Sequence, residues 1–444
     1  MNQSKAFLQS VDSVKDVPEE VLVRARQSLL DYLAVAAAGA KFQEDKLRRY
    51  LDFAQPEEGA FTAIGMGRRL ALKEAVFLNG LNGHALDFDD GTNAGIIHLG
   101  SPIFSVLLPL AQRHDVSLRE LLRAAVIGYE ASYTMAVSIQ PGHKAMGYHA
   151  TATCGVLGAT VAAAYMLGFT EEERFRAFAT ACVASTGTLK VLDDGSELKP
   201  YNVAKTALLA LTALQLAKAG FREHPDPLGG DRGFFRIMTG KPEVELKRVL
   251  LGGTYAIQKS YTKPYASCRY THPAVEAAIR LRERCGLTAA DVERIDVRTY
   301  SLAVPKHDHT DIPGSYSAKM SIPYSTAAGL IYGKAGLQEF SEERVKDATV
   351  LGLTKKVHVS ADEALSAAFP REQTAIVTIT TTKGVVSERV DFPKGEPENP
   401  LTTAEFRDRY DGLMAYAGVD AQTRGRVFDL VLADGNPREL LALL

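Results

Sequence analysis

Apolar side chains recur at helical spacing through most of the first 260 residues. The stretch from Val21 to Ala38 follows Asp16, Pro18 and two glutamates, which are typical of a helix start, and Gly39 is expected to end this helix. Further helices are predicted at residues 70–85, 102–113, 117–137, 151–167, 170–185 and 202–219. This part of the chain is therefore predicted to be almost entirely helical.

The periodicity changes after about residue 265. Residues 292–300 alternate between apolar and polar side chains, which predicts a strand. Residues 374–381 and 385–392 are rich in β-branched side chains on either side of a Lys-Gly pair, which predicts a hairpin. Helices are predicted at 273–284 and 324–332, and after a proline-rich stretch at 393–400 they return at 403–416 and 421–432.

These patterns predict a mainly α fold with a smaller α+β domain. Because the last helices have the same apolar periodicity as the first part of the chain, a large all-helical domain is expected to contain both chain ends, residues 1–265 and 400–444. The α+β domain, residues 266–399, is then an insertion in that domain.

Composition limits the possible partners. Hydrophobic residues make up 46% of the chain and charged residues 23%, and the net charge of -2 gives no reason to expect a nucleic acid or membrane partner. Four scattered cysteines without a CxxC pair argue against a zinc ribbon or a disulfide framework. The first residues lack a signal-peptide pattern, and the apolar stretches are too interrupted to span a membrane. A soluble, cytoplasmic protein is expected.

The first candidate site is an acid-rich loop. Asp87, Asp89 and Asp90 follow the helix predicted at 70–85, where the negative end of the helix dipole disfavours carboxylates. Ser101 and Pro102 then resemble the cap and first position of the next helix. Charges that local stability would not select are expected at functional sites.

Three loops place a basic or titratable residue just ahead of a predicted helix start. They carry His98, the pair Tyr148-His149, and Lys199. A helix N-terminus attracts carboxylate or phosphate, so converging loops of this kind would form a pocket for a small polyanion.

Simpler interpretations remain open for each residue. A histidine in such a loop can be a capped surface or core residue, and a lysine can be a solvated charge. The acids from Asp87 to Asp90 could bind a metal, although their spacing differs from DDxxD and no second acidic motif follows. The His307-Asp308-His309 segment is either a polar loop or, less simply, part of a metal site.

Five motifs, in order along the chain, carry a family resemblance. They are His84-Ala-Leu-Asp-Phe-Asp-Asp90, Gly147-Tyr-His-Ala-Thr-Ala-Thr153, Lys199-Pro-Tyr-Asn, Gly230-Asp-Arg-Gly-Phe-Phe235 and Cys268-Arg-Tyr-Thr-His-Pro273. Together they resemble the MmgE/PrpD family, which includes 2-methylcitrate dehydratase, cis-aconitate decarboxylase and iminodisuccinate epimerase. The resemblance implies an active site between a helical domain and an α+β lid domain, a homodimer, and no metal or organic cofactor.

The resemblance also implies roles for individual residues. The expected catalytic residues are Asp87, His98, His149, Lys199 and Tyr324. The expected substrate-binding residues are Thr92, Tyr148, Arg269 and His272. The chain has Asp90-Gly-Thr92 where many relatives have consecutive Asp-Asp-Thr, so an extra residue shifts Thr92.

The implied chemistry is the making or discharging of negative charge beside a carboxylate of a small di- or tricarboxylic acid. A positioned base removes the proton, and cationic or hydrogen-bonding groups stabilise the resulting charge. The expectation is a cofactor-independent lyase that dehydrates a hydroxy-polycarboxylate such as 2-methylcitrate. Decarboxylation of a cis-aconitate type, epimerisation of an imino- or amino-dicarboxylate, and a non-catalytic helical scaffold are the alternatives.

Overall fold

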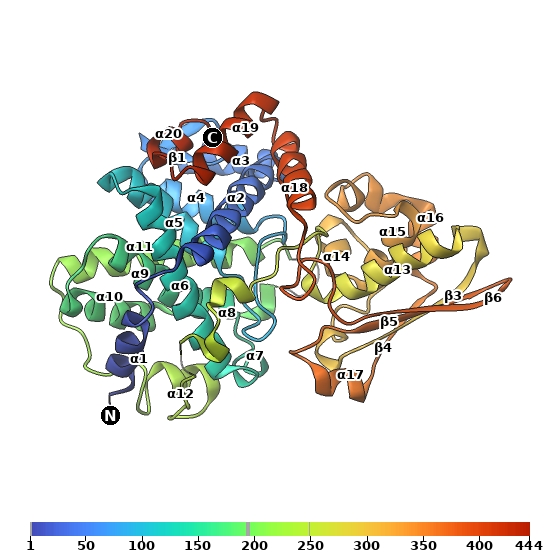
Figure 1. The fold of residues 1–444 in the computed structure, drawn as a ribbon, viewed down its shortest axis with the longest axis horizontal. Coiled ribbons are helices and arrows are strands. Elements are labelled where there is room, and N and C mark those ends of the chain that lie inside the picture. Colours follow the sequence, from blue (N-terminus) through green and yellow to red (C-terminus); the bar gives the residue numbers. More distant parts are fainter. Residues whose placement is uncertain (1, 192–195, 248) are drawn as a thin grey trace. The chain divides into compact units, whose positions relative to one another are not determined.

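A computed structural model describes residues 2–191, 196–247 and 249–444 of the chain. The chain groups into two compact units (Figure 1). The helical unit comprises Met1–Lys190, Leu198–Ser260 and Thr403–Leu444, and the mixed unit comprises Val191–Glu197 and Tyr261–Thr402. The predicted two-domain arrangement stays a prediction.

The helical unit confirms the mainly α character of the chain. Its longer helices are α1 (Gln3–Asp12), α2 (Glu19–Phe42), α3 (Glu44–Ala54), α4 (Leu72–His84), α5 (Gly100–His114), α6 (Leu118–Ile139), α9 (Gly155–Met166), α10 (Glu171–Ala184), α11 (Lys199–Lys218), α18 (Thr403–Tyr416) and α19 (Ala421–Leu432). Short helices are α7 (Gly142–Ala145), α8 (Ala150–Thr153), α12 (Phe234–Thr239) and α20 (Pro437–Leu441). A small hairpin that the sequence patterns did not indicate joins β1 (Glu58–Ala63) to β2 (Arg68–Leu70).

The prediction that Gly39 ends a helix is wrong. Helix α2 continues to Phe42, and Gly39 lies where α2 and α4 approach each other. A Cβ atom at Gly39 would lie only 2.1 Å from the carbonyl oxygen of Asn82, on α4. The glycine therefore permits close helix packing, a role that outweighs its low helix propensity.

Both ends of the chain contribute to the helical unit. Helix α18, near the C-terminus, packs against α2, near the N-terminus (Figure 1). Asp31 on α2 and Arg409 on α18 form a buried ion pair, with side chains 3% and 7% exposed. The last helices thus pack within the same unit as the first part of the chain, whereas the predicted domain bounds stay a prediction.

The mixed unit contains one four-stranded sheet with the order β4-β3-β5-β6. Its strands are β3 (Val292–Thr299), β4 (Val357–Ala361), β5 (Ala375–Thr381) and β6 (Gly384–Val390). Strands β5 and β6 form the predicted antiparallel hairpin, whereas β3 and β4 run parallel. A parallel pair requires a long crossover, which here consists mainly of helices.

Helices cover this sheet. The mixed unit contains α13 (His272–Cys285), α14 (Ser315–Met320), α15 (Ile322–Tyr332), α16 (Ala348–Thr354) and α17 (Glu363–Ala368). Helix α13 packs on β5 and β6, and α15 packs on α13 and β4. Residues of β5 alternate between buried and half-buried, as expected for a sheet with one covered face. Across the described parts of the chain, no helix combines the length and apolarity needed to cross a bilayer.

Candidate active site

The acid-rich loop begins with a backbone conformation that is uncommon for a residue other than glycine. Asp87, three residues after the end of α4, has a φ of 50°. Its backbone N–H still donates to the carbonyl of His84, 3.2 Å away. Aspartate tolerates this left-handed region better than most residues, and backbone strain of this kind is concentrated at functional sites. The loop thereby holds the Asp87 carboxylate in a buried position.

Lys199 is the counterion of this carboxylate. Its Nζ lies 2.8 Å from Oδ2 of Asp87, and the two side chains are 12% and 9% exposed. The lysine is the first residue of α11 and is distant in sequence from the acid loop. The ion pair therefore brings a half-buried positive charge to the loop.

His98 is held by the same loop. Its Nδ1 lies 2.9 Å from the carbonyl oxygen of Asp90 and 3.4 Å from Oδ1 of Asp89. Both oxygens are acceptors, so Nδ1 carries the proton and donates it. In the neutral imidazole, the lone pair is then on Nε2, which lies 3.8 Å from Oδ1 of Asp87.

His149 has the opposite tautomer. Asn202 Nδ2 lies 3.3 Å from the carbonyl oxygen of Thr188, which can only accept, so this amide nitrogen is correctly placed as a donor. The same nitrogen lies 3.2 Å from Nδ1 of His149, which must therefore accept. Burial, with a smaller contribution from the charge on Lys199, holds the pKa of His149 well below its usual value. His149 is thus a neutral imidazole with its proton on Nε2.

The contacts of Asp90 explain how a carboxylate is accommodated after α4. Its Oδ1 accepts the backbone N–H of Gly100 at the start of α5, 2.9 Å away, and Oδ2 accepts the hydroxyl of Tyr129 at 2.6 Å. The acid thus lies at the positive end of the following helix, where a carboxylate is favourable. Burial nevertheless raises the pKa of Asp90 to about 6.

The prediction that Ser101 caps the next helix is also wrong. Helix α5 begins at Gly100, with no side-chain cap on its own flanking residue. Ser101 Oγ lies 2.9 Å from both the carbonyl oxygen of Gly83 and Oδ2 of Asp89. Asp89 also accepts from Nδ1 of His84, at 2.8 and 2.9 Å from its two oxygens. Ser101 and His84 therefore fix Asp89 from two sides.

A metal could in principle use this cluster. His84, Asp87, Asp89 and His98 each offer one ligand atom, and these four atoms lie within 4.8 Å of one another in the described part of the chain. Nitrogen and oxygen ligands together suit a divalent transition metal. The ammonium group of Lys199 already binds Asp87, and Nδ1 of His84 is already held by Asp89. A protein cation thus occupies part of the cluster, and we assign no metal to it.

Two further predicted residues lie in the helical unit. Thr92 is buried, its backbone pairs with Ile97, and its Oγ1 has no hydrogen-bond partner within the described residues. Tyr148 pairs through its backbone with Thr188, and its ring packs on His143 with centroids 5.5 Å apart. The roles of Thr92 and Tyr148 in substrate binding stay predictions.

The remaining three predicted residues lie in the mixed unit. The hydroxyl of Tyr324 donates to the carbonyl of Glu339 at 2.7 Å. Arg269 forms a buried ion pair with Glu396, and its Nη1 lies 2.8 Å from Nδ1 of His272. The structure therefore brings together Asp87, His98, His149 and Lys199, whereas the roles of Tyr324, Arg269 and His272 stay predictions.

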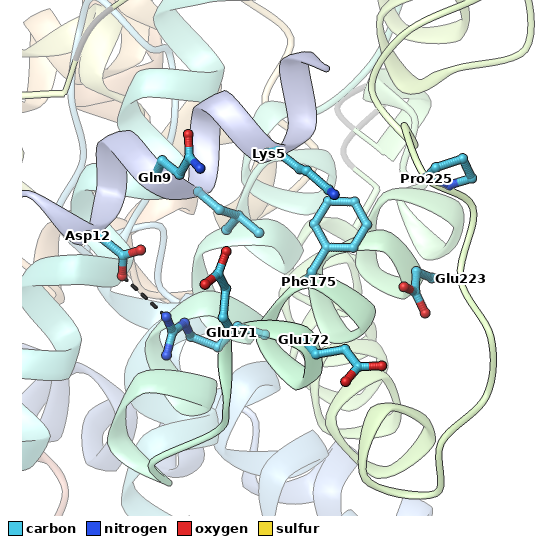
Figure 2. Close-up of a pocket in the computed structure, with 10 residues that line it drawn as sticks. Lys5, Gln9, Asp12, Glu171, Glu172, Phe175, Glu223 and Pro225 are labelled. Atoms are coloured by element: carbon cyan, nitrogen blue, oxygen red, sulfur yellow. Dashed lines mark hydrogen bonds and ion pairs between the residues drawn. The ribbon is translucent and has the colours of Figure 1, made fainter. Parts of the chain in front are cut away.

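A separate pocket of about 370 Å³ lies against α1 and α10 (Figure 2). Four carboxylates line it: Asp12, Glu171, Glu172 and Glu223. Arg174 lies 3.4 Å from Asp12, and Arg176 pairs with Glu172 and Glu223. Lys5 also lines the pocket, and no predicted site residue is among the described side chains that line it. We therefore do not include this pocket in the candidate active site.

Sequence reasoning overlooked two contributors to the cluster. His84 was quoted only as part of a motif, and Asn202 only as the end of Lys199-Pro-Tyr-Asn. Lys199 and Asn202 are three residues apart on α11, a spacing that places two side chains on one face of a helix. That spacing was a usable signal for Asn202, whereas the partner of His84 depended on how the loop turns.

Fold and site together define a mainly helical protein with a buried cluster of histidines and carboxylates around one lysine. The chain belongs to the MmgE/PrpD family. The N-terminal domain of that family matches residues 7–247, and its C-terminal domain matches residues 265–434.

The chain is similar to cis-aconitate decarboxylases and 2-methylcitrate dehydratases. The chain is 25% identical to cis-aconitate decarboxylase of Aspergillus terreus, over 97% of this chain and 92% of the relative. It is 24% identical to cis-aconitate decarboxylase of Mus musculus, over 89% and 83% of the two chains. It is 25% identical to 2-methylcitrate dehydratase of Escherichia coli, over 54% and 52%. These relatives are enzymes, and the identities support membership of the family without selecting one reaction.

Proposed function

We propose that the protein is a lyase that dehydrates a small hydroxy-polycarboxylate of the 2-methylcitrate type without a metal or organic cofactor. The observation that carries this proposal is the pair of opposite tautomers on His98 and His149. Dehydration needs one group that takes a proton from carbon and another that gives a proton to the leaving hydroxyl. The unprotonated Nε2 of His98 supplies the first function, and the protonated Nε2 of His149 supplies the second.

His98 acts as the base. The acceptors of Asp90 and Asp89 keep the proton on Nδ1, so the lone pair on Nε2 is the one that can take a proton. When it does so, the Asp87 carboxylate 3.8 Å away stabilises the imidazolium.

His149 acts as the acid. Its low pKa keeps the ring neutral and so prevents a second fixed positive charge beside Lys199. The neutral ring gives its Nε2 proton to the leaving hydroxyl, the ammonium group of Lys199 stabilises the imidazolate that remains, and a proton from water restores Nε2–H. Asn202 is a positioning residue that keeps the proton on the correct nitrogen.

Lys199 supplies the positive charge that the reaction needs. Removing a proton beside a carboxylate develops enolate-like charge on the carboxylate oxygens, and a half-buried ammonium group stabilises it more strongly than water can. Asp87 holds Lys199 in place through the 2.8 Å ion pair and shares it with the substrate carboxylate.

Decarboxylation of a cis-aconitate-like acid is the second candidate function. The similarity to the Aspergillus terreus cis-aconitate decarboxylase extends over 97% of this chain, against 54% for the Escherichia coli dehydratase. Decarboxylation requires a proton donor for the carbanion but no base, so it would use His149 and leave His98 without a chemical step. Epimerisation would use both histidines and lose no group.

A substrate panel in deuterated water separates these reactions. We expect 2-methylcitrate or a close hydroxy acid to lose water and give an unsaturated acid. Loss of carbon dioxide from cis-aconitate would replace this proposal by the decarboxylase. An inverted, deuterated iminodisuccinate without loss of a group would assign the epimerase, and tight binding without turnover would assign a scaffold. Activity abolished by EDTA and restored by magnesium would indicate that the aspartates of the loop bind a metal.

His98→Asn tests the base. Asparagine keeps an N–H donor close to the position of Nδ1 but has no group at the position of Nε2, so kcat should fall by about a hundredfold or more with little change in KM. The matched control is His114→Asn, an exposed histidine at the end of α5 that should leave turnover unchanged. Equal activity in both variants would remove His98 from the mechanism.

Asn202→Asp tests the tautomer of His149. A carboxylate cannot donate to Nδ1, so it should transfer the imidazole proton to that atom and raise the pKa of His149. The expected result is a lower kcat together with a shifted pH profile. Asn202→Leu should lower kcat without that shift, which distinguishes the loss of a donor from a reversed tautomer.

A further inference from the structure

The mixed unit contains a cysteine and a histidine in contact. Sγ of Cys268 lies 3.7 Å from Nε2 of His307. The cysteine is half-buried and precedes α13, whereas the histidine is 6% exposed. The two residues are 39 positions apart, and neither has a part in the proposed dehydration.

The orientation of His307 is fixed by its surroundings. Its Nδ1 lies 2.9 Å from the carbonyl oxygen of Pro305, which can only accept, so Nδ1 carries the proton of the neutral ring. Its own carbonyl accepts the backbone N–H of Ile322 at 2.8 Å. The ring of Tyr270 packs edge-to-face on the imidazole, with centroids 5.2 Å apart. The Nε2 lone pair is therefore directed at the thiol of Cys268.

A histidine held in this way acts as a base for the thiol. A carbonyl or carboxylate that fixes Nδ1–H, combined with a nucleophile at Nε2, is the arrangement that activates a cysteine. Charged and titratable groups near the pair include the phenols of Tyr270 and Tyr300, the guanidinium of Arg269 and the carboxylate of Glu396. Glu396 forms a buried ion pair with Arg269, which offsets its negative charge.

The other cysteines differ from Cys268. Burial raises the pKa of Cys154 to about 12 and that of Cys182 well above its usual value, so these thiols stay protonated and shielded. Cys285 is exposed at the last position of α13, and no histidine is paired with its thiol among the hydrogen bonds of the described residues. Cys268 is thus the cysteine with both partial exposure and an oriented base.

We propose that Cys268 and His307 form a covalent modification site for α,β-unsaturated carbonyl compounds. The Sγ proton moves to Nε2 of His307, and the thiolate adds to the β-carbon of the acceptor. The carbon–carbon π pair moves to the α-carbon as an enolate, which takes a proton from the imidazolium. One S–C bond and one C–H bond form, and the S–H and C=C π bonds are consumed, so no oxidant is needed.

N-ethylmaleimide labelling of the full chain tests this site, with mass spectrometry used to follow each cysteine-containing peptide. An unassisted thiol of pKa about 8.5 loses about twentyfold in rate between pH 8 and pH 6.5, because its thiolate fraction falls. The rate at Cys268 should fall by less than about threefold over the same interval. A twentyfold fall at Cys268 would overturn the proposal. The assay needs no turnover, so its result is independent of the proposed lyase function.

His307→Gln separates base catalysis from a structural role. Glutamine can occupy the position of the imidazole but cannot take a proton at neutral pH, so labelling of Cys268 at pH 6.5 should fall about tenfold relative to Cys285. At pH 9 the variant and the wild type should label at similar rates, because the thiol then ionises unaided. An unchanged rate at pH 6.5, or an equal loss at both pH values, would contradict the proposal.

The buried cysteines provide the folding control for this variant. Cys154 and Cys182 should stay unlabelled in a folded chain. If they become reactive in the variant, the pH profile of Cys268 in the wild-type chain decides the proposal.

Discussion

The carboxylates of Asp87, Asp89 and Asp90 have different environments although they lie close together in the chain. Asp87 binds the ammonium group of Lys199, and Asp89 accepts from His84. Asp90 instead accepts from a backbone N–H and a tyrosine hydroxyl, and burial raises its pKa to about 6. A carboxyl group of this kind stabilises the folded state when it is protonated and loses that contribution as it ionises.

Asp90→Asn should therefore change how stability depends on pH. The folded pKa of about 6 exceeds the ordinary value of 3.8, so the wild type loses stability between about pH 4 and pH 6, by about 3 kcal/mol for this shift. Asparagine accepts from Gly100 and can pair with Tyr129 without ionising. The free energy of unfolding of the variant, measured by urea titration, should rise relative to that of the wild type by this amount as the pH increases.

The comparison isolates Asp90 from groups that act in the opposite sense. His143 and His149 have lowered pKa values and remove stability as the pH falls below 6.5, but they are present in both proteins and cancel in the difference. Asp408→Asn, at an exposed position of α18, controls for the loss of one carboxylate from the chain. A flat difference for Asp90→Asn would show that Asp90 titrates normally.

At the scale of elements, small residues decide how closely the helices pack. Gly39 allows α2 to approach the backbone of α4, and α4 leads directly into the acid loop. The position of the loop thus depends on a glycine more than forty residues upstream.

Gly39→Ala should destabilise the protein although alanine is the better helix former. The added methyl group meets the carbonyl oxygen of Asn82 at 2.1 Å, and overpacking of this kind costs about 1–3 kcal/mol. The matched control is Gly412→Ala on α18. No atom from another part of the described chain lies within 4 Å of a Cβ atom added there, and helix propensity predicts a gain in stability of up to about 1 kcal/mol. Thermal unfolding midpoints should move in opposite directions, and a shared direction would contradict the packing argument.

At the scale of the whole molecule, the last forty residues help to hold the acid loop. Arg409 on α18 binds Asp31, donates to the carbonyl of Phe88 at 2.8 Å, and has its guanidinium 4.3 Å from the ring centre of Phe88. Phe88 lies between Asp87 and Asp89. One arginine therefore joins the C-terminal segment, α2 and the loop of the candidate active site.

Arg409→Met should be strongly destabilising, because it leaves Asp31 buried without its counterion. The expected loss is about 3–5 kcal/mol in the free energy of unfolding, and Asp31→Asn in the same chain should recover part of it. Arg426→Met, which removes an exposed ion pair with Glu439, should cost no more than about 1 kcal/mol. Equal effects of the two arginine variants in urea unfolding would remove the proposed connection.

Some properties followed from the sequence alone. Apolar periodicity predicted α4, α6, α10 and the β5–β6 hairpin to within a few residues, because a period of 3.6 or 2 is a local property of the chain. Motif order identified the family, and it also selected Asp87, His98 and His149, which lie around Lys199. Homodimer formation and a cytoplasmic location stay predictions from the sequence.

The tertiary structure decided what each group can do. Asp90 caps a helix that starts ten residues later, Asn202 sets the tautomer of His149 from 53 residues away, and Arg409 reaches Phe88 across 321 residues. Periodicity cannot predict such partners, because a hydrogen bond depends on the distance between atoms in space rather than on separation along the chain. The sequence therefore supplied the residues of the candidate site, and folding supplied their charges and tautomers.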